Sequence, residues 1–227
     1  MNNNKKYDAI LLAGEGKSSY KVHHQNKAFL TINGTCLIHY IVETLQKVKS
    51  IQDIYVVGPK EKLQQALLSG RIDLKSPKRI HIVEQKTTLY QNIWHTFLQS
   101  LQDENAEAPN TKSHRDRAVL IVPCDAPLMT PQEVEYFISH ADMEKYDLVS
   151  GLVSREKLQH FYPQKKTLGI KMAYIHFKEA SFRINNLHMV KPLCIENREY
   201  IQKMYQYRYQ RNFKNLILFS LSLFGKD

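Results

Sequence analysis

Cysteine is scarce in this chain, and no two cysteines are closely spaced. The 227 residues contain three, Cys36, Cys124 and Cys194, an odd number without a C-x-x-C pair. This pattern excludes a disulfide framework and a zinc ribbon. Isolated thiols are typical of proteins kept in a reducing compartment, so we expect a cytoplasmic protein.

Long hydrophobic runs are also missing. No window approaches the roughly 20 consecutive apolar residues that a membrane-spanning helix needs. Residues 1–6 are polar and lead directly into an apolar segment, so a secretory signal is not expected. Internal repeats and low-complexity tracts are absent from the sequence as well.

Acidic residues are outnumbered by basic ones. The chain has 22 Asp and Glu against 32 Lys and Arg, a formal net charge of +10. Such an excess favours an anionic partner: a nucleotide, a nucleic acid or an anionic lipid. Because no RNP, KH or dsRBD pattern is present, nucleic acid is not expected. With 43% hydrophobic and 24% charged residues, the composition excludes a mainly disordered chain.

Short apolar runs alternate with amphipathic segments over the first 150 residues. Four runs have the character of buried strands, and each is followed by apolar residues at helical spacing. The predicted strands are 7–13, 51–58, 79–83 and 118–122, and the predicted helices are 35–49, 59–67, 88–101 and 130–140. This alternation predicts an α/β fold with helices layered on a mainly parallel sheet.

Shorter elements are predicted around and after this core. Residues 28–32 form a short extended piece that the turn dipeptide Asn33-Gly34 closes. Thr130 to Glu133 is a capping box with proline at the first helical position. Later extended pieces are predicted at 147–152, 172–177 and 188–190, followed by a helix at 197–210.

The first predicted strand ends in a glycine-containing segment. It reads Leu12-Ala13-Gly14-Glu15-Gly16-Lys17, and Lys27 follows ten residues later. Glycines after a strand let backbone amides approach a phosphate, and a lysine adds a positive charge. On these residues alone, an ordinary glycine turn with solvated lysines is the alternative. A P-loop is not favoured, because that motif needs a glycine where Leu11 stands.

The fourth predicted strand ends in a carboxylate. Asp125 leaves the strand within Pro123-Cys124-Asp125-Ala126-Pro127. A carboxylate fixed in this way is a good Mg²⁺ ligand, although Asp125 could instead cap a turn. Ligands of open α/β sheets bind beyond the carboxyl ends of the strands. We therefore expect Asp125 and the glycine segment to open on one crevice.

Together these motifs resemble those of the molybdenum-cofactor guanylyltransferase-like (MobA-like) NTP transferases. The segment from Leu12 to Gly16 matches the family's opening motif, Lys27 matches its lysine, and 32–38 matches the piece that follows. The second motif matches Asp125, Pro127, Thr130 and Pro131. The resemblance covers residues 7–150 and implies a Rossmann-like three-layer sandwich of the glycosyltransferase-A type, with a mainly parallel central sheet.

The resemblance also implies an activity: Mg²⁺-dependent transfer of a nucleoside monophosphate from an NTP to a phosphate or hydroxyl group, with release of pyrophosphate. The acceptor would be a small molecule or a lipid-linked phosphate. Lys27 would stabilise charge at the α-phosphate, and Asp125 would hold Mg²⁺. The residues implied to bind the substrates are Leu12, Ala13, Gly14, Glu15, Gly16, Lys17, Arg183 and Asn186. A β-turn at Asn185-Asn186 is the alternative for that segment, and Lys171 is a further candidate contact to the acceptor.

The chain departs from the family in the glycine segment. Ser18 stands where the family has an arginine that helps to hold the triphosphate. His23 and His24 follow in the same loop, and we expect them to be exposed to solvent rather than to bind metal. The loss of the arginine keeps a second interpretation open: a catalytically impaired relative that binds a nucleotide or anionic lipid.

The end of the chain differs in character from the rest. We expect residues 1–195 to form the nucleotidyltransferase-like domain and 196–227 to form a C-terminal helical appendage. Leu216 to Phe224 is apolar except for two serines, and basic and tyrosine residues precede it. As a helix these nine residues would span about 14 Å, too little to cross a bilayer. The appendage either packs on the domain or in a homodimer, or lies at an anionic membrane surface.

Overall fold

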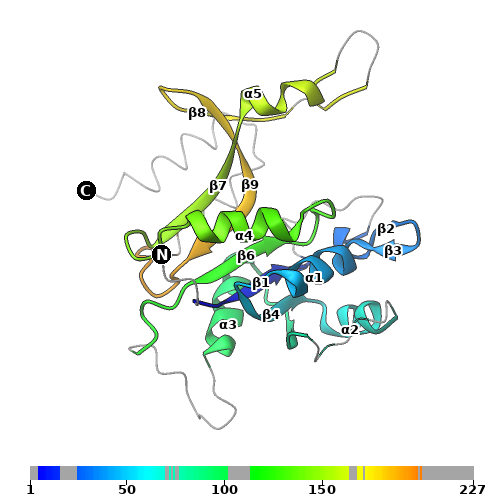
Figure 1. Ribbon diagram of the computed structural model, residues 1–227. Helices are drawn as coiled ribbons and strands as arrows, with labels where there is room; N and C mark the ends of the chain where they lie inside the picture. Colours follow the sequence, from blue (N-terminus) through cyan, green and yellow to red (C-terminus); the bar gives the residue numbers. More distant parts are fainter. Residues whose placement is uncertain are drawn as a thin grey trace.

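The computed structural model describes residues 5–15, 25–69, 72, 74, 77–101, 113–163, 168–170, 172–198 and 200. Within this part, a seven-stranded sheet has the order β5-β4-β1-β6-β9-β7, and β8 pairs with β9 (Figure 1). The strands of this sheet are β1 (Tyr7–Leu12), β4 (Ile51–Gly58), β5 (Ile80–Glu84), β6 (Val119–Pro123), β7 (Leu148–Ser154), β8 (Ile175–His176) and β9 (Ser181–Val190).

The first four strands of this order are parallel, as the alternating pattern predicts. β1 lies in the middle of them, between β4 and β6, and β5 extends the sheet beyond β4. β9 then returns antiparallel beside β6, and β7 pairs antiparallel with β9. The parallel strands therefore bring their carboxyl ends to a single edge of the sheet.

Helices cover both faces of the sheet and make three layers (Figure 1). On one face, Leu11 of β1 belongs to a core that also contains apolar residues of three helices; on the other, Ile10 packs in a core with Phe97. The first core is covered by α1 (Leu37–Lys47), α2 (Lys60–Ser69) and α4 (Pro131–His140), and the second by α3 (Leu89–Ser100). The predicted α/β three-layer sandwich is confirmed.

The start of α1 differs from the prediction. Residues Thr31–Ile32 and Thr35–Cys36 form a small antiparallel pair, β2 and β3, so the helix begins at Leu37 rather than at Thr35. Asn33 and Gly34, with φ of 50° and 78°, make the turn between them. Two successive residues with positive φ suit a tight hairpin, and this turn chemistry outweighs the helical spacing of the following apolar residues. The segment before β2 is a 3₁₀ turn, η1 (Lys27–Phe29), rather than an extended piece from Ala28.

The segment around Asn186 is a strand and not a turn. β9 runs without interruption from Ser181 to Val190, so the β-turn alternative at Asn185-Asn186 is wrong. Asn186 instead has a φ of 66°, and the pairing of β7 with β9 shifts register between Ser150 and Leu152. Between these pairs β7 advances by two residues and β9 by four, so the bulge absorbs two extra residues of β9. Asparagine tolerates the left-handed conformation that the bulge needs.

Beyond this bulge, β7 and β9 extend away from the sheet. The short helix α5 (Arg155–Leu158), the 3₁₀ turn η2 (Gln159–Phe161) and β8 lie at the far end of this two-stranded ribbon (Figure 1). Only residues 175–176 of the predicted 172–177 piece are a strand. We call residues 152–184 the arm.

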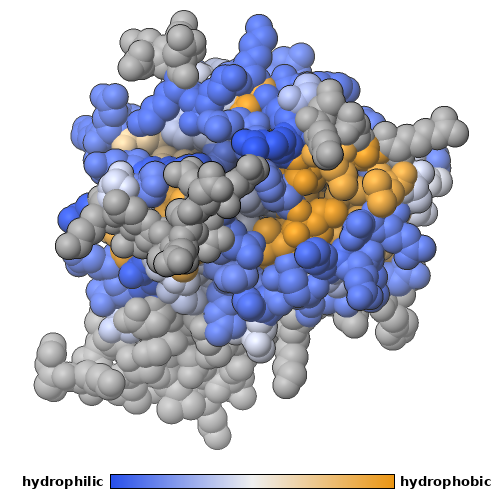
Figure 2. Space-filling model, turned by 90° about the horizontal axis from the view of Figure 1, so that it is seen from below, coloured by the Kyte–Doolittle hydropathy of each residue, from blue (hydrophilic) through white to orange (hydrophobic). Residues whose placement is uncertain are grey.

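The surface of the described part is mainly polar on the side away from the arm. Seen from below, hydrophilic residues cover most of this face, and apolar ones gather in one area at its right (Figure 2). Among the helices of the described residues, none has the length and apolar character required to traverse a bilayer. The predicted helix beyond Tyr200 and the apolar stretch Leu216 to Phe224 lie outside the described residues.

Candidate active site

Three neighbouring strands end together at one edge of the sheet. Just past β1, the amide of Ala13 donates a hydrogen bond to the carbonyl of Val57 in β4, at 2.8 Å. Just past β6, the amide of Cys124 donates to the carbonyl of Leu12, at 3.1 Å. The glycine segment and the Asp125 segment therefore leave the sheet side by side, as the topology predicts.

Gly58, at the end of β4, lets the chain after β1 pass very close. A Cβ atom on Gly58 would lie 2.7 Å from the carbonyl oxygen of Ala13 and 2.9 Å from a methyl group of Leu63. No side chain fits at such a distance from backbone, so the glycine is required by the close approach. It fixes the position of Ala13 and of the segment that follows.

The start of the glycine segment is held from the β5 side. The amide of Glu15 donates to the side-chain carbonyl of Gln85, at 2.6 Å, and the Glu15 carboxylate accepts from Lys62 at 3.3 Å. Of the amides expected to hold phosphate, those of Ala13 and Glu15 thus already have protein partners. Gly16 and Lys17, the other predicted residues of this segment, lie outside the described residues.

Asn26 links the glycine segment to Lys27. Its amide nitrogen Nδ2 donates to the carbonyl of Ala13 at 2.7 Å, and its Oδ1 accepts from the amide of Ala28 at 3.0 Å. Asn26 is the N-cap of the 3₁₀ turn η1, and that turn carries Lys27. The lysine is therefore presented at the same strand edge as Ala13.

Lys27 and Asp125 meet across the site. The Nζ atom of Lys27 lies 2.6 Å from Oδ2 of Asp125, although 98 residues separate them in the chain. About a third of each side chain is exposed, at 34% and 33%. The two residues predicted to carry the chemistry are thus brought together in a position that a ligand can reach.

The thiol of Cys124, next to this pair, is buried. Burial, and then the negative charge of Asp125, raise the pKa of Cys124 to about 12. The thiol therefore stays protonated at neutral pH and serves as packing beneath the ion pair, not as a nucleophile.

An open hollow of about 660 Å³ lies beside Asp125. Apolar side chains from η1, the β2–β3 hairpin and the start of α1 form most of its wall, with Asp125 and Pro127 on the β6 side. The lining residues are Gln25, Phe29, Leu30, Thr31, Ile32, Leu37, Asp125 and Pro127. The hollow gives a small molecule access to the Asp125 carboxylate.

Asn186 and Arg183 have different positions relative to this edge. The last pair that β6 and β9 make on this side joins Ile121 to His188. Because these strands are antiparallel, Asn186 lies two residues further toward the edge at which Asp125 leaves β6. Arg183 pairs with Val153 three residues beyond, on the arm. Lys171 lies outside the described residues.

The donors for a metal ion are few. Among the described residues there is no group of three or more His, Cys, Asp or Glu side chains that could hold one. Asp125 offers a carboxylate at the site, with Oδ2 directed to Lys27, while the Glu15 carboxylate of the glycine segment is directed to Lys62. This set does not suit zinc, which takes several protein ligands. It does suit Mg²⁺, which keeps several waters and binds through one or two carboxylates and substrate phosphates.

Sequence reasoning missed two residues that build the site. Asn26 and Gln85 were not among the predicted residues, although both hold the glycine segment. Gln85 directly follows β5, so the rule that ligands bind beyond strand ends could have pointed to it. Asn26 stands immediately before Lys27, where an asparagine is a common cap for a helical turn.

Known proteins give the same picture of the fold. No protein of curated function matches the chain. Many solved structures do, three of which follow. A hypothetical transferase from Thermus thermophilus has 17% identity and a TM-score of 0.63, covering 95% of this chain and 76% of its own. The 4-diphosphocytidyl-2C-methyl-D-erythritol synthase from Anaerococcus prevotii has 16% identity and a TM-score of 0.51. The match covers 98% of this chain and 84% of the synthase chain. A CMP:2-keto-3-deoxy-manno-octonic acid synthetase complexed with CTP has 12% identity and a TM-score of 0.53. The match covers 90% of this chain and 85% of the synthetase chain.

At these identities the three structures establish a shared fold. The family assignment comes from a sequence profile described as the MobA-like NTP transferase domain, which matches residues 9–218. The match includes both strand ends described above and extends over most of the chain. The chain therefore belongs to the family of MobA-like NTP transferase domains.

Proposed function

We propose that this protein is a nucleotidyltransferase that moves a nucleoside monophosphate from an NTP to a phosphate- or hydroxyl-bearing acceptor. The observation that carries the proposal is the Lys27–Asp125 pair, 2.6 Å apart at the edge where the parallel strands end and partly exposed to solvent. Family membership supports the same reaction.

In this reaction an acceptor oxygen attacks the α-phosphorus of the NTP. A new P–O bond forms, the bond from the α-phosphorus to the bridging oxygen breaks, and pyrophosphate leaves with its electron pair. Lys27 would turn its ammonium group toward the α-phosphate oxygens, where negative charge develops. Such transfers depend on positioning and charge neutralisation, so a reactive nucleophile on the protein is not needed. A phosphate acceptor is already ionised at pH 7 and requires no general base.

Asp125 would hold Mg²⁺, with Asn186 at the same edge as a candidate to contact the metal or the acceptor. When bound, Mg²⁺ supplies charge that neutralises phosphate oxygens. Lys27 and Asp125 neutralise each other without substrate, and this pairing keeps both side chains in place until a polyphosphate arrives. Asp125 would then release Lys27 and would be free to hold the metal.

The glycine segment would bind the nucleotide phosphates. Because the amide of Glu15 donates to Gln85, a phosphate oxygen can take the place of the Gln85 carbonyl without leaving a buried amide unpaired. Leu12 and Ala13 would set the position of the segment, and Gly14, Gly16 and Lys17 would contact the phosphates.

The proposal for the rest of the chain follows the sequence. Residues 1–195 would be the catalytic domain and 196–227 an appendage. The acceptor would be a small molecule or a lipid-linked phosphate, and the protein would act in the cytoplasm.

A second candidate function rests on Ser18. Since the family arginine is replaced there, the chain could bind a nucleotide without transferring it. A lysine nearby cannot reproduce the bidentate contact of an arginine with phosphate.

Thermal unfolding with each of the four NTPs, with and without Mg²⁺, tests nucleotide binding. We expect one NTP with Mg²⁺ to raise the melting temperature, as ligands that bind only the native state do. Asp125→Asn should remove the part of the shift that depends on Mg²⁺. Glu43→Gln, on an exposed position of α1, is the matched control and should retain it.

Pyrophosphate release in the presence of phosphate-bearing acceptors then separates the two functions. Release that requires both NTP and acceptor, and that Asp125→Asn lowers, supports the transferase. Binding of NTP with no release from any acceptor supports the binding module. No shift with any NTP would overturn both.

A further inference from the structure

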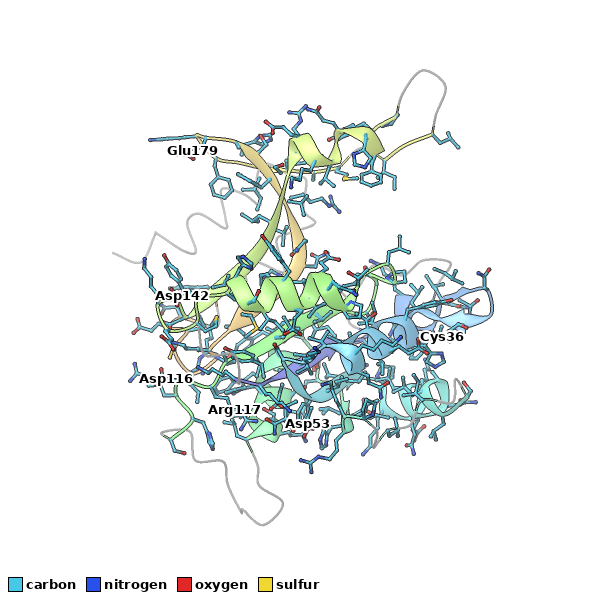
Figure 3. All side chains as sticks on the ribbon, in the orientation of Figure 1. Cys36, Asp53, Asp116, Arg117, Asp142 and Glu179 are labelled. Atoms are coloured by element: carbon cyan, nitrogen blue, oxygen red, sulfur yellow. The ribbon has the colours of Figure 1, made fainter. Side chains whose placement is uncertain are left out.

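The arm lies outside both hydrophobic cores. β6 pairs with β9 only as far as His188, and beyond it β9 pairs with β7 and β8 alone. Neither core cluster of buried residues contains a described residue of 152–184. Figure 3 shows Glu179, at the tip of the β8–β9 hairpin, far from the sheet and its helices. The arm is therefore a projection whose side chains face solvent on several sides.

Large apolar side chains are concentrated on this projection. Of the 13 exposed large hydrophobic residues in the described part, seven lie in the arm. Leu168 is fully exposed, Ile170 is 69% exposed, and Phe161 and Phe177 are each about half exposed. Scattered apolar residues on a surface need no explanation, but such a concentration marks an interaction site.

Five of these seven residues form two groups at the two ends of the arm's outer part, and the other two, Leu152 and Ile184, pair with each other at its base. In the first, the amide of Ile170 donates to the carbonyl of Phe161 at 3.0 Å, which holds Ile170 beside Phe161 beyond α5, and Leu168 lies two residues before Ile170. In the second, Ile175 pairs with Phe182 across β8 and β9, and the ring of Phe177 meets that of Phe182 edge-on, with centroids 5.8 Å apart. Figure 1 shows α5 and β8 at a similar distance from the sheet, on either side of the ribbon.

The arm is also strongly basic. Residues 152–184 contain seven Lys or Arg and two Glu, a formal charge of +5, which is half of the +10 of the whole chain. Among the described residues, Arg155, Lys157, Lys178 and Arg183 belong to this set, and all four are exposed. A surface that combines apolar side chains with positive charge complements an anionic and partly apolar partner.

Such a partner is an anionic lipid surface rather than a second copy or a folded acidic protein. Two arms of charge +5 repel each other, which disfavours their pairing. A folded partner must match about 800 Å² of shape, whereas the apolar residues here stand in two separate groups. A bilayer accepts separate insertions without shape complementarity, and its anionic headgroups attract the basic residues.

We propose that the outer part of the arm is a membrane-docking element, in which Phe161, Leu168, Ile170, Ile175 and Phe177 insert into the interface of an anionic bilayer. Arg155, Lys157, Lys178 and Arg183 contact the lipid phosphates. The docked protein then holds its sheet away from the membrane, with the arm between them.

Vesicle flotation of the full-length protein tests this element. The vesicles contain phosphatidylcholine alone or with about 30% phosphatidylserine. We expect binding to the anionic vesicles only, and a steep loss of binding at about 0.5 M salt. The triple variant Phe161→Ser, Leu168→Ser, Ile170→Ser should lower the partition coefficient at least about tenfold, since apolar burial drives insertion. Arg155→Glu with Lys178→Glu should lower it by about fivefold or more for each basic residue removed.

Exposed apolar residues elsewhere provide the matched control. Leu68→Ser and Tyr136→Ser, on α2 and α4, should leave flotation unchanged. The variants alter exposed side chains, and equal melting temperatures verify that the domain stays folded. Unchanged flotation of both arm variants overturns the proposal, as does equal binding to neutral vesicles.

Two further results would also overturn the proposal. In the first, a truncation at Asn212 abolishes flotation while the arm variants still float. This result would assign membrane contact to the C-terminal segment. Sedimentation that shows a dimer broken by the triple variant, without vesicle binding, assigns the arm to a second copy of the chain.

Discussion

Lys27 is the residue on which the proposed transfer depends most directly. We expect Lys27→Met to lower pyrophosphate release about 100-fold, because it removes the charge opposite the α-phosphate. The free energy of unfolding should change by less than about 1 kcal/mol, since the pair with Asp125 is a third exposed and such pairs stabilise little. Pyrophosphate release and thermal unfolding measure the two effects. Lys145→Met, at an exposed position, is the control; equal turnover in both variants would contradict the role of Lys27.

Cys124 provides a test of the site's geometry that needs no substrate. Its pKa is raised to about 12, chiefly by burial, so almost none of it is thiolate at pH 8. We expect iodoacetamide to leave Cys124 unmodified in the native protein and to modify it in urea, as peptide mass spectrometry would show. The partly exposed Cys36 and Cys194 serve as internal references. Alkylation of native Cys124 at their rate would mean that the segment after β6 is open.

His188 gives the fold a dependence on pH. Burial lowers its pKa below the ordinary 6.5, and its ring contacts the hydroxyl of Ser150 at 2.9 Å. As the pH falls, His188 therefore takes up a proton in the unfolded chain at a higher pH than in the native protein. The free energy of unfolding is unaffected by this histidine above pH 6.5 and decreases as the pH falls below that value. Burial lowers the pKa of His95 too, so this histidine acts in the same direction.

We expect the free energy of unfolding, from urea titrations, to fall between about pH 7.5 and about pH 5.5, and His188→Gln to reduce that fall. His160→Gln, at an exposed position on the arm, should not. A pH dependence that is identical in the two variants would exclude His188 as a cause.

At the scale of the elements, the sequence predicts the parallel half of the molecule well. Each of its strands contains an apolar run, and the cap predicted at Thr130 forms, with its side-chain oxygen accepting from the amide of Glu133. Thr88 caps α3 in the same way, by accepting from the amide of Gln91, although that cap is not among the predictions from the sequence. The Lys27–Asp125 meeting is also predictable, because both residues follow strands whose carboxyl ends share an edge.

The antiparallel half is less predictable, and the reason is physical. The strand through Asn185 and Asn186 contains polar residues, and two of its three partners, β6 and β7, come from distant parts of the chain. Local turn propensity at the two asparagines is real, but the structure uses it for a bulge and not for a reversal. The same long-range pairing carries Arg183 onto the arm, a position that spacing alone does not reveal.

The junction of β4 with the chain after β1 is sensitive to a single methyl group. In Gly58→Ala the new Cβ would lie 2.7 Å from the Ala13 carbonyl oxygen, so backbone must move. We expect a loss of about 1–3 kcal/mol in the free energy of unfolding, and weaker NTP binding, because the glycine segment begins at Ala13. Denaturant titration and NTP-induced thermal shifts measure these effects.

Gly34→Ala is the control for this substitution. Any loss of stability in this variant comes from the φ of 78° at Gly34, because no atom lies within 4 Å of the new Cβ. It should reduce stability by about 1 kcal/mol and leave NTP binding intact. If Gly58→Ala binds NTP as tightly as Gly34→Ala, the junction does not position the phosphate site.

At the scale of the whole molecule, the charge of +10 acts on every anionic ligand. We expect the association rate of the bound NTP to fall steeply between about 0.05 M and about 0.5 M salt, because screening removes long-range attraction. The dissociation rate should change less. Stopped-flow binding at several salt concentrations measures both rates, and an association rate independent of salt would show that the net charge does not steer the nucleotide.

The place of β9 in the sheet has a consequence for how the chain folds as it is synthesised. β9 lies between β6 and β7, yet it is the last of the three to leave the ribosome. Until residues 181–190 emerge, the apolar strand β6 is an unprotected sheet edge, and β7 has no strand to pair with in the main sheet. An unpaired apolar edge invites pairing with other chains. Nascent chains that stall between α4 and β9 are therefore the form of this protein most exposed to aggregation and to capture by chaperones.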